Sequence, residues 1–149
     1  MSKRSEKAVA YHKKGYNCAQ SVACAFMDVV PVDEDTLFRV LEGFGGGMGD
    51  LKGSCGALSG AVAVTGLLKS RGKDQCLSKK ETYVLSSQVL DQFTQKHHTY
   101  VCEELKGGRI HEPLEICNGY IEDAVQILEK VLKEAGLIQH KGRLLTITP

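Results

Sequence analysis

The sequence predicts an all-α protein, a bundle of about five to six helices that forms a single domain over residues 1–149. Apolar residues recur at the three- to four-residue spacing of a helix face in several segments. Proline occurs only 3 times, and the glycines stand mainly at the ends of these segments or in one loop. A composition of 42% hydrophobic and 25% charged residues is typical of a soluble chain that buries a core.

The first half of the chain contains three expected helices. A polar, helix-prone segment covers residues 5–14. Asn17 is a suitable N-cap for a second helix, which continues at helical apolar spacing until Pro31 ends it. The acidic residues 33–35 are suited to the first turn of a third helix, which Gly43 ends.

A glycine-rich loop and a helix of small residues follow. Half of residues 43–56 are glycine, so no regular element is expected there. Residues 57–70 predict a helix at the centre of the fold, because small side chains let backbones approach closely. The β-branched residues of this segment leave a buried strand as an alternative. Residues 71–75 form a charged connector.

The second half of the chain predicts two long helices. One covers residues 78–96 and, on one interpretation, continues beyond Thr99 to Leu105. A loop is expected at residues 109–115. The last helix covers residues 117–135, with one apolar face and a glycine directly after it. The short tail at residues 144–148 is β-prone and predicts a strand or an extended arm.

Charge and hydropathy exclude several classes of protein. The formal net charge of +1 gives no basic excess for nucleic-acid binding. The first 14 residues lack the apolar core of a secretion signal. The longest charge-free run, residues 53–68, is shorter than the roughly 20 apolar residues of a membrane span. We therefore expect a cytoplasmic protein that binds no nucleic acid and does not insert into a membrane.

The cysteines are the unusual feature of the composition. A chain of this length does not need disulfides to fold, and cytosolic cysteines more often serve metal binding or redox chemistry. No C-x-x-C pair occurs, which argues against a thioredoxin-like site and a zinc ribbon. The six cysteines are Cys18, Cys24, Cys55, Cys76, Cys102 and Cys117.

Three of these cysteines, Cys18, Cys55 and Cys117, fall at expected helix N-termini. Unpaired N–H groups and the helix dipole stabilise a thiolate there. Cys102 lies either in a last helical turn or just after a break. Any single cysteine can instead be a small packing residue, and this is the interpretation we favour for Cys24. We expect Cys76, in a charged connector, to be exposed and incidental.

The glycine loop does not match either of the nucleotide-binding glycine patterns, so no nucleotide is expected. We expect the loop to bend sharply and bring Cys55 against other backbone. Its N–H groups would then donate hydrogen bonds to thiolate or sulfide sulfur. The glycines expected to contribute to such a cofactor site are Gly45, Gly46, Gly47 and Gly56.

The histidines give weaker signals. His98 and Cys102 are four residues apart and would form a mixed nitrogen–sulfur metal pair if one helix carried both. A solvated His97–His98 pair on a polar surface is the alternative that we favour. His12, His111 and His140 lie among charged residues and are expected to be exposed.

Three motifs together resemble a known family. They are Asn-Cys-Ala-Gln-Ser at 17–21, Gly-Phe-Gly-Gly-Gly-Met-Gly at 43–49 and Cys-Gly-Ala-Leu-Ser-Gly at 55–60, followed by single later cysteines. In this pattern the chain resembles the C_GCAxxG_C_C family of redox-active proteins over roughly residues 8–132. The resemblance implies a bacterial or archaeal protein whose four family cysteines are Cys18, Cys55, Cys102 and Cys117.

The resemblance also suggests a chemistry. A similar module occurs in split-Soret cytochromes, where the cysteines are thought to hold an iron–sulfur centre. This chain lacks C-x-x-C-H, so no covalent haem is implied.

Three functional hypotheses follow. In the first, the four cysteines converge on one iron–sulfur centre for electron transfer with a redox partner protein, with zinc as the alternative metal. In the second, they form a metal-free thiol–disulfide oxidoreductase or redox sensor. In the third, the chain is a non-catalytic helical interaction module. The small-residue helix could also serve a homodimer interface.

Overall fold

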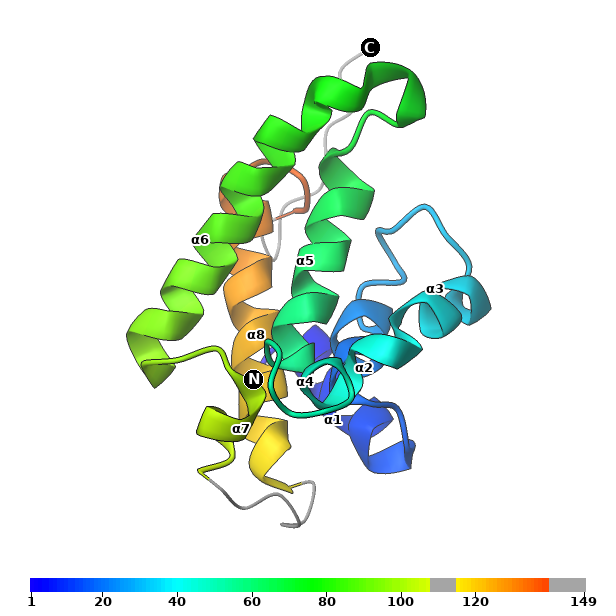
Figure 1. Ribbon diagram of the computed structural model, residues 1–149. Helices are drawn as coiled ribbons and strands as arrows, with labels where there is room; N and C mark the ends of the chain where they lie inside the picture. Colours follow the sequence, from blue (N-terminus) through cyan, green and yellow to red (C-terminus); the bar gives the residue numbers. More distant parts are fainter. Residues whose placement is uncertain (108–114, 140–149) are drawn as a thin grey trace.

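A computed structural model describes residues 1–107 and 115–139, and these residues form an all-α bundle (Figure 1). The helices of seven residues or more are α1 (Lys3–Lys14), α2 (Cys18–Cys24), α3 (Glu34–Leu41), α5 (Gly56–Lys69), α6 (Lys79–His97) and α8 (Glu115–Glu134). The shorter ones are η1 (Glu42–Phe44), α4 (Gly45–Met48), η2 (Lys73–Ser78) and α7 (Cys102–Leu105). The predicted fold class and number of main helices are confirmed. The β-prone tail lies outside the described residues.

Helix α5 lies at the centre of the described bundle and packs against α2, α6 and α8 (Figure 1). The alternative of a buried strand is therefore wrong. Small residues explain the close packing: a Cβ added at Gly60 would lie 2.4 Å from the carbonyl oxygen of Ala19. The α2 and α5 backbones thus meet where neither helix presents a bulky side chain.

Side-chain caps fix where the first helices begin. Asn17 Oδ1 accepts the N–H of Gln20, and Gln20 Oε1 accepts the N–H of Asn17, both at 2.9 Å. This reciprocal pair is a capping box and confirms the predicted N-cap. Asp33 caps α3 through the N–H of Thr36, so the acidic residues expected in the first turn lie there.

One helix ends earlier than the sequence predicts, and another ends close to the predicted position. The α-helix that begins at Cys18 ends at Cys24. The chain then continues in tighter turns, in which the N–H of Phe26 bonds to Ala23 O at 3.0 Å. Helix α6 ends at His97, which confirms the predicted end near residue 96, and its C-cap residue His98 has a left-handed φ of +68° and donates its N–H to Thr94 O. The alternative of a continuation to Leu105 is therefore wrong, and α7 is a separate helix.

The glycine-rich segment contains short turns where no regular element was expected. The single turn α4 includes Gly46 and Gly47, both with left-handed backbone angles. The chain then runs to Ser54, which forms an isolated antiparallel bridge with Val101. Among the described helices, none has the length and apolar character needed to cross a membrane.

Candidate functional site

All four family cysteines lie at helix N-termini. Cys18 is the first residue of α2, Cys55 is the N-cap residue of α5, and Cys117 is the third residue of α8. This confirms the three predicted positions. Cys102, whose position the sequence left open, is the first residue of α7. Each thiol therefore lies at a helix end that carries unpaired N–H groups and a partial positive charge.

The fold brings these four thiols together. Cys18 interacts electrostatically with Cys117, Cys55 and Cys102, and Cys117 has the largest effect on its pKa. Cys55 interacts with Cys102 and Cys117, and Cys102 with Cys117. Cys55, Cys102 and Cys117 are 6%, 6% and 7% exposed. Residues from four distant segments thus form one cluster, which we call the cysteine cluster.

Backbone hydrogen bonds hold the Cys55 and Cys102 segments against each other. The N–H of Cys55 donates to Tyr100 O at 2.7 Å, and the N–H of Cys102 donates to Gly53 O at 3.0 Å. The Ser54–Val101 bridge lies between them. This short antiparallel pairing fixes the entry to α5 beside the entry to α7.

Close approach explains two glycines of the motifs. A Cβ at Gly47 would lie 2.4 Å from Cys102 Cβ and 3.3 Å from Cys102 Sγ. A Cβ at Gly56 would lie 3.0 Å from Cys18 Cβ. At both positions, the absence of a Cβ leaves room for the side chain of a cysteine of the cluster. A Cβ at Gly45 would lie 2.5 Å from the Asn17 side chain, and Gly46 has open space but a φ of +60°. Their role in cofactor binding stays a prediction.

The interaction between Cys18 and Cys117 shifts the pKa values of the two thiols in opposite directions. A hydrogen bond to Cys117 raises the pKa of Cys18, and burial raises this pKa further. The same hydrogen bond lowers the pKa of Cys117 to about 6. Burial opposes this shift, and the ammonium of Lys106 supports it. The two opposite pKa shifts favour the proton on Cys18 and the negative charge on Cys117.

The other two cysteines of the cluster favour the protonated state. Burial raises the pKa of Cys55 to about 11, although the N–H groups of Ala57 and Leu58 lower it. Burial also raises the pKa of Cys102, while Lys106 lowers it. These N–H groups are the backbone donors that we expected at a helix start, but at Cys55 burial has the larger effect.

Four thiols are suitable donors for iron or zinc. Within residues 1–107 and 115–139, no three His, Cys, Asp or Glu side chains are grouped so that they could hold a metal ion. The chemistry of the four donors fits a metal centre.

The family model described as "Putative redox-active protein (C_GCAxxG_C_C)" matches residues 16–131. The chain belongs to this family. The matched range of this C_GCAxxG_C_C protein contains all four cysteines of the cluster. No curated protein and no solved structure matches the chain. The relation to split-Soret cytochromes stays a prediction.

The two remaining cysteines behave as expected. Cys24 is fully buried in the core, and burial raises its pKa to about 11. Cys76 is exposed.

The histidine predictions need correction. His12 is 3% exposed, and its Nδ1 lies 2.7 Å from Asn118 Oδ1. It shares the inward face of α1 with Ser5 and Ala8, whose small size hid the apolar pattern. His98 is exposed, as favoured, and it does not share a helix with Cys102, so the alternative of a mixed metal pair is wrong. His111 and His140 lie outside the described residues.

Three side chains that had no role in the predicted site lie on or against α7 and α8. His97 is half-buried and bonds to Asp123 on α8 instead of facing solvent. Lys106 is four residues after Cys102, and Tyr120 is three residues after Cys117. Both spacings put the two side chains of each pair on one helix face, and this was the signal that could have identified them.

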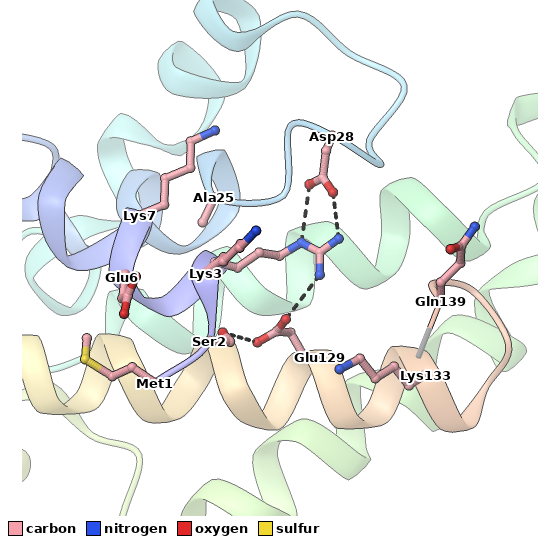
Figure 2. A pocket seen from close by; sticks show the side chains of 11 residues that line it. Met1, Ser2, Lys3, Glu6, Lys7, Ala25, Asp28, Glu129, Lys133 and Gln139 are labelled. Carbon is pink, nitrogen blue, oxygen red and sulfur yellow. Dashed lines mark hydrogen bonds and ion pairs between the residues drawn. The ribbon is translucent and has the colours of Figure 1, made fainter. Parts of the chain in front are cut away.

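A separate pocket of about 860 Å³ lies between the start of α1, the end of α2 and α8 (Figure 2). Arg4 pairs there with Asp28 at 2.6 Å and with Glu129 at 3.1 Å. The Ser2 hydroxyl also donates a hydrogen bond to Glu129. Figure 2 shows Asp28 and Glu129 along the wall of the pocket. These charges satisfy one another, so we interpret them as a structural network that joins α1 to α8.

Proposed function

We propose that the cysteine cluster is the redox site of the protein and that Cys18 and Cys117 form its thiol–disulfide couple. The observation that carries the proposal is the convergence of these two thiols, which interact from the starts of α2 and α8 and whose pKa values shift in opposite directions. A pair already held close together needs little movement to form a disulfide. The proposed location is the cytoplasm, where thiols are kept reduced.

The chemistry follows from the two different protonation states. The Cys117 thiolate attacks one oxygen of hydrogen peroxide, the O–O bond breaks, and the released hydroxide takes a proton to form water. Cys117 is now a sulfenic acid. The Cys18 sulfur then attacks the Cys117 sulfur, the S–S bond forms, and the Cys18 proton leaves with the hydroxyl group as a second water. The two cysteines lose two electrons and the peroxide gains them.

The low exposure of the two thiols favours a small oxidant. Cys117 is 7% exposed and Cys18 is only partly exposed. A small peroxide reaches such a thiolate more easily than a bulky disulfide does. A dithiol partner protein would return the pair to its reduced state by thiol–disulfide exchange.

A second candidate is a four-thiolate metal centre. Every thiol of the cluster is in electrostatic contact with the other three, and each lies at a helix N-terminus. Bound iron–sulfur would supply one-electron transfer, and zinc would supply structural support. The residues that would hold the metal are Cys18, Cys55, Cys102 and Cys117.

A redox titration of the full chain in thiol–disulfide buffers tests the first candidate. Wild-type protein is expected to show one two-electron couple, read as the loss of two alkylatable thiols. Cys18→Ala and Cys117→Ala abolish this couple, whereas the matched controls Cys24→Ala and Cys76→Ala retain it. Persistence of the couple in Cys18→Ala would contradict the proposal.

Metal and acid-labile sulfide analysis of anaerobically prepared protein separates the two candidates. Iron and sulfide, with visible absorption that bleaches on reduction, would support the metal centre and overturn the thiol couple as the main function. Cys55→Ala and Cys102→Ala would then lose metal. The thiol couple instead predicts that both variants remain redox-active.

A further inference from the structure

Beside the cysteine cluster, a chain of contacts joins the end of α6 to α7 and α8. His97 Nε2 lies 2.7 Å from Asp123 Oδ2. The His97 ring meets the Tyr120 ring edge-on, with centroids 5.0 Å apart. The Tyr120 hydroxyl donates to Leu105 O at 2.7 Å. The contacts thus run from Asp123 through His97 and Tyr120 to the last residue of α7.

The last of these contacts matters because α7 has only four residues. A single turn is not stable by itself, and the carbonyl groups of its last residues have no partner within the helix. Tyr120 gives Leu105 O the partner that the helix lacks. Leu105 is itself 7% exposed, so loss of this donor would remove a hydrogen bond from a largely buried residue.

The same hydrogen bond connects two cysteine-bearing turns. Cys102 and Leu105 are the first and last residues of α7. Cys117 precedes Tyr120 by three positions on α8, a spacing that puts both on one helix face. The Tyr120–Leu105 bond therefore ties the turn of Cys102 directly to the turn of Cys117.

We propose that Tyr120 is a positioning residue of the cysteine cluster, whose hydroxyl holds α7 so that Cys102 stays buried beside Cys117. The effect on redox chemistry rests on the function proposed above. The effect on the position of Cys102 does not. Cys102 is 6% exposed, so a reagent reaches it mainly when α7 opens locally.

Tyr120→Phe tests this role, because it removes the hydroxyl and keeps the ring that packs against His97 and Phe93. In the reduced full chain, alkylation of Cys102 by N-ethylmaleimide is expected to become about fivefold faster than in wild type, as the loss of one net hydrogen bond implies. The reduction potential of the site is expected to shift. Tyr83→Phe, at an exposed tyrosine of α6, is the matched control and changes neither.

The alkylation rate of the buried core residue Cys24 distinguishes local opening of α7 from a general loss of stability. Equal acceleration at Cys24 and Cys102 would show global opening and overturn the proposal, as would no acceleration at Cys102. A wild-type protein without a measurable redox couple would contradict the proposed thiol function instead. The Cys102 alkylation rate would still decide whether Tyr120 positions α7.

Discussion

Cys18, at the first position of α2, interacts with Cys117 in the first turn of α8, and the pKa values of the two thiols shift in opposite directions. Two helix N-termini therefore meet at this pair, and the lowered pKa favours the negative charge on Cys117. The pair differs in this respect from Cys55 and Cys102, whose burial favours neutral thiols.

The reactivity of Cys117 should depend on pH through this lowered pKa. Because the pKa of Cys117 is lowered to about 6, its alkylation by iodoacetamide should rise with pH through that value and level off above it. Cys18→Ala removes the interaction with Cys18, so the pKa of Cys117 and the midpoint of the curve should rise. Mass spectrometry of the alkylated peptide measures both curves. Cys76→Ala is the control, and an unchanged midpoint in Cys18→Ala would contradict the effect of Cys18 on this pKa.

Gly47 and Gly46 provide a matched test of the loop against Cys102. Both have a φ near +60°, so an alanine at either position costs about 1–2 kcal/mol of backbone strain. Only at Gly47 does the new Cβ meet Cys102, at 2.4 Å. Gly47→Ala should therefore lose a further ~1–3 kcal/mol of unfolding free energy. Urea unfolding measures the difference, and equal losses would show that Gly47 is not needed for close packing.

The contact between α2 and α5 can be tested in the same way. Gly60→Ala places a Cβ 2.4 Å from Ala19 O, and the backbones must separate at a cost of about 1–3 kcal/mol. Gly66 lies in the same helix, and a Cβ added there would meet no neighbouring atom within 4 Å. Gly66→Ala should therefore raise stability by roughly 0.5–1 kcal/mol. Thermal unfolding of both variants should give opposite signs. Unchanged or raised stability in Gly60→Ala would contradict the close packing of α2 against α5.

The buried ion pair of the α1–α8 network should matter more than an exposed one. Arg4→Met leaves the Glu129 carboxylate, whose side chain is 9% exposed, without its cation. We expect a loss of roughly 1–3 kcal/mol in unfolding free energy. Arg39→Met removes an exposed pair with Asp35 and should cost about 0–1 kcal/mol. Denaturant unfolding compares them, and equal losses would show that the network adds no stability.

Helix positions and most cysteine positions were predictable because they depend on local signals. The Asn17 cap, the acidic first turn of α3 and the small residues of α5 are readable from adjacent residues. The sequence left open whether α7 is a separate helix, because the turn before it pairs Val101 with Ser54, which are far apart in sequence. His12 was misplaced for a similar reason: its partner Asn118 lies on the last helix.

The motifs identified which cysteines belong together, but not how they differ. Cys18 and Cys117 acquire opposite pKa shifts only because α2 and α8 meet. The glycines before Cys55 were expected to serve the site through their N–H groups. The structure also shows a steric reason for glycine at position 47, since the Cys102 side chain occupies the volume that a Cβ of residue 47 would need.

Disulfide mapping of the oxidised protein tests the central claim most directly. The full chain is treated with one equivalent of hydrogen peroxide, the remaining thiols are blocked, and a non-reducing digest is analysed by mass spectrometry. The account predicts a linked pair of peptides that carry Cys18 and Cys117, with Cys24 and Cys76 alkylated. Recovery of Cys18 and Cys117 as unlinked thiols, in protein free of iron and zinc, would contradict it.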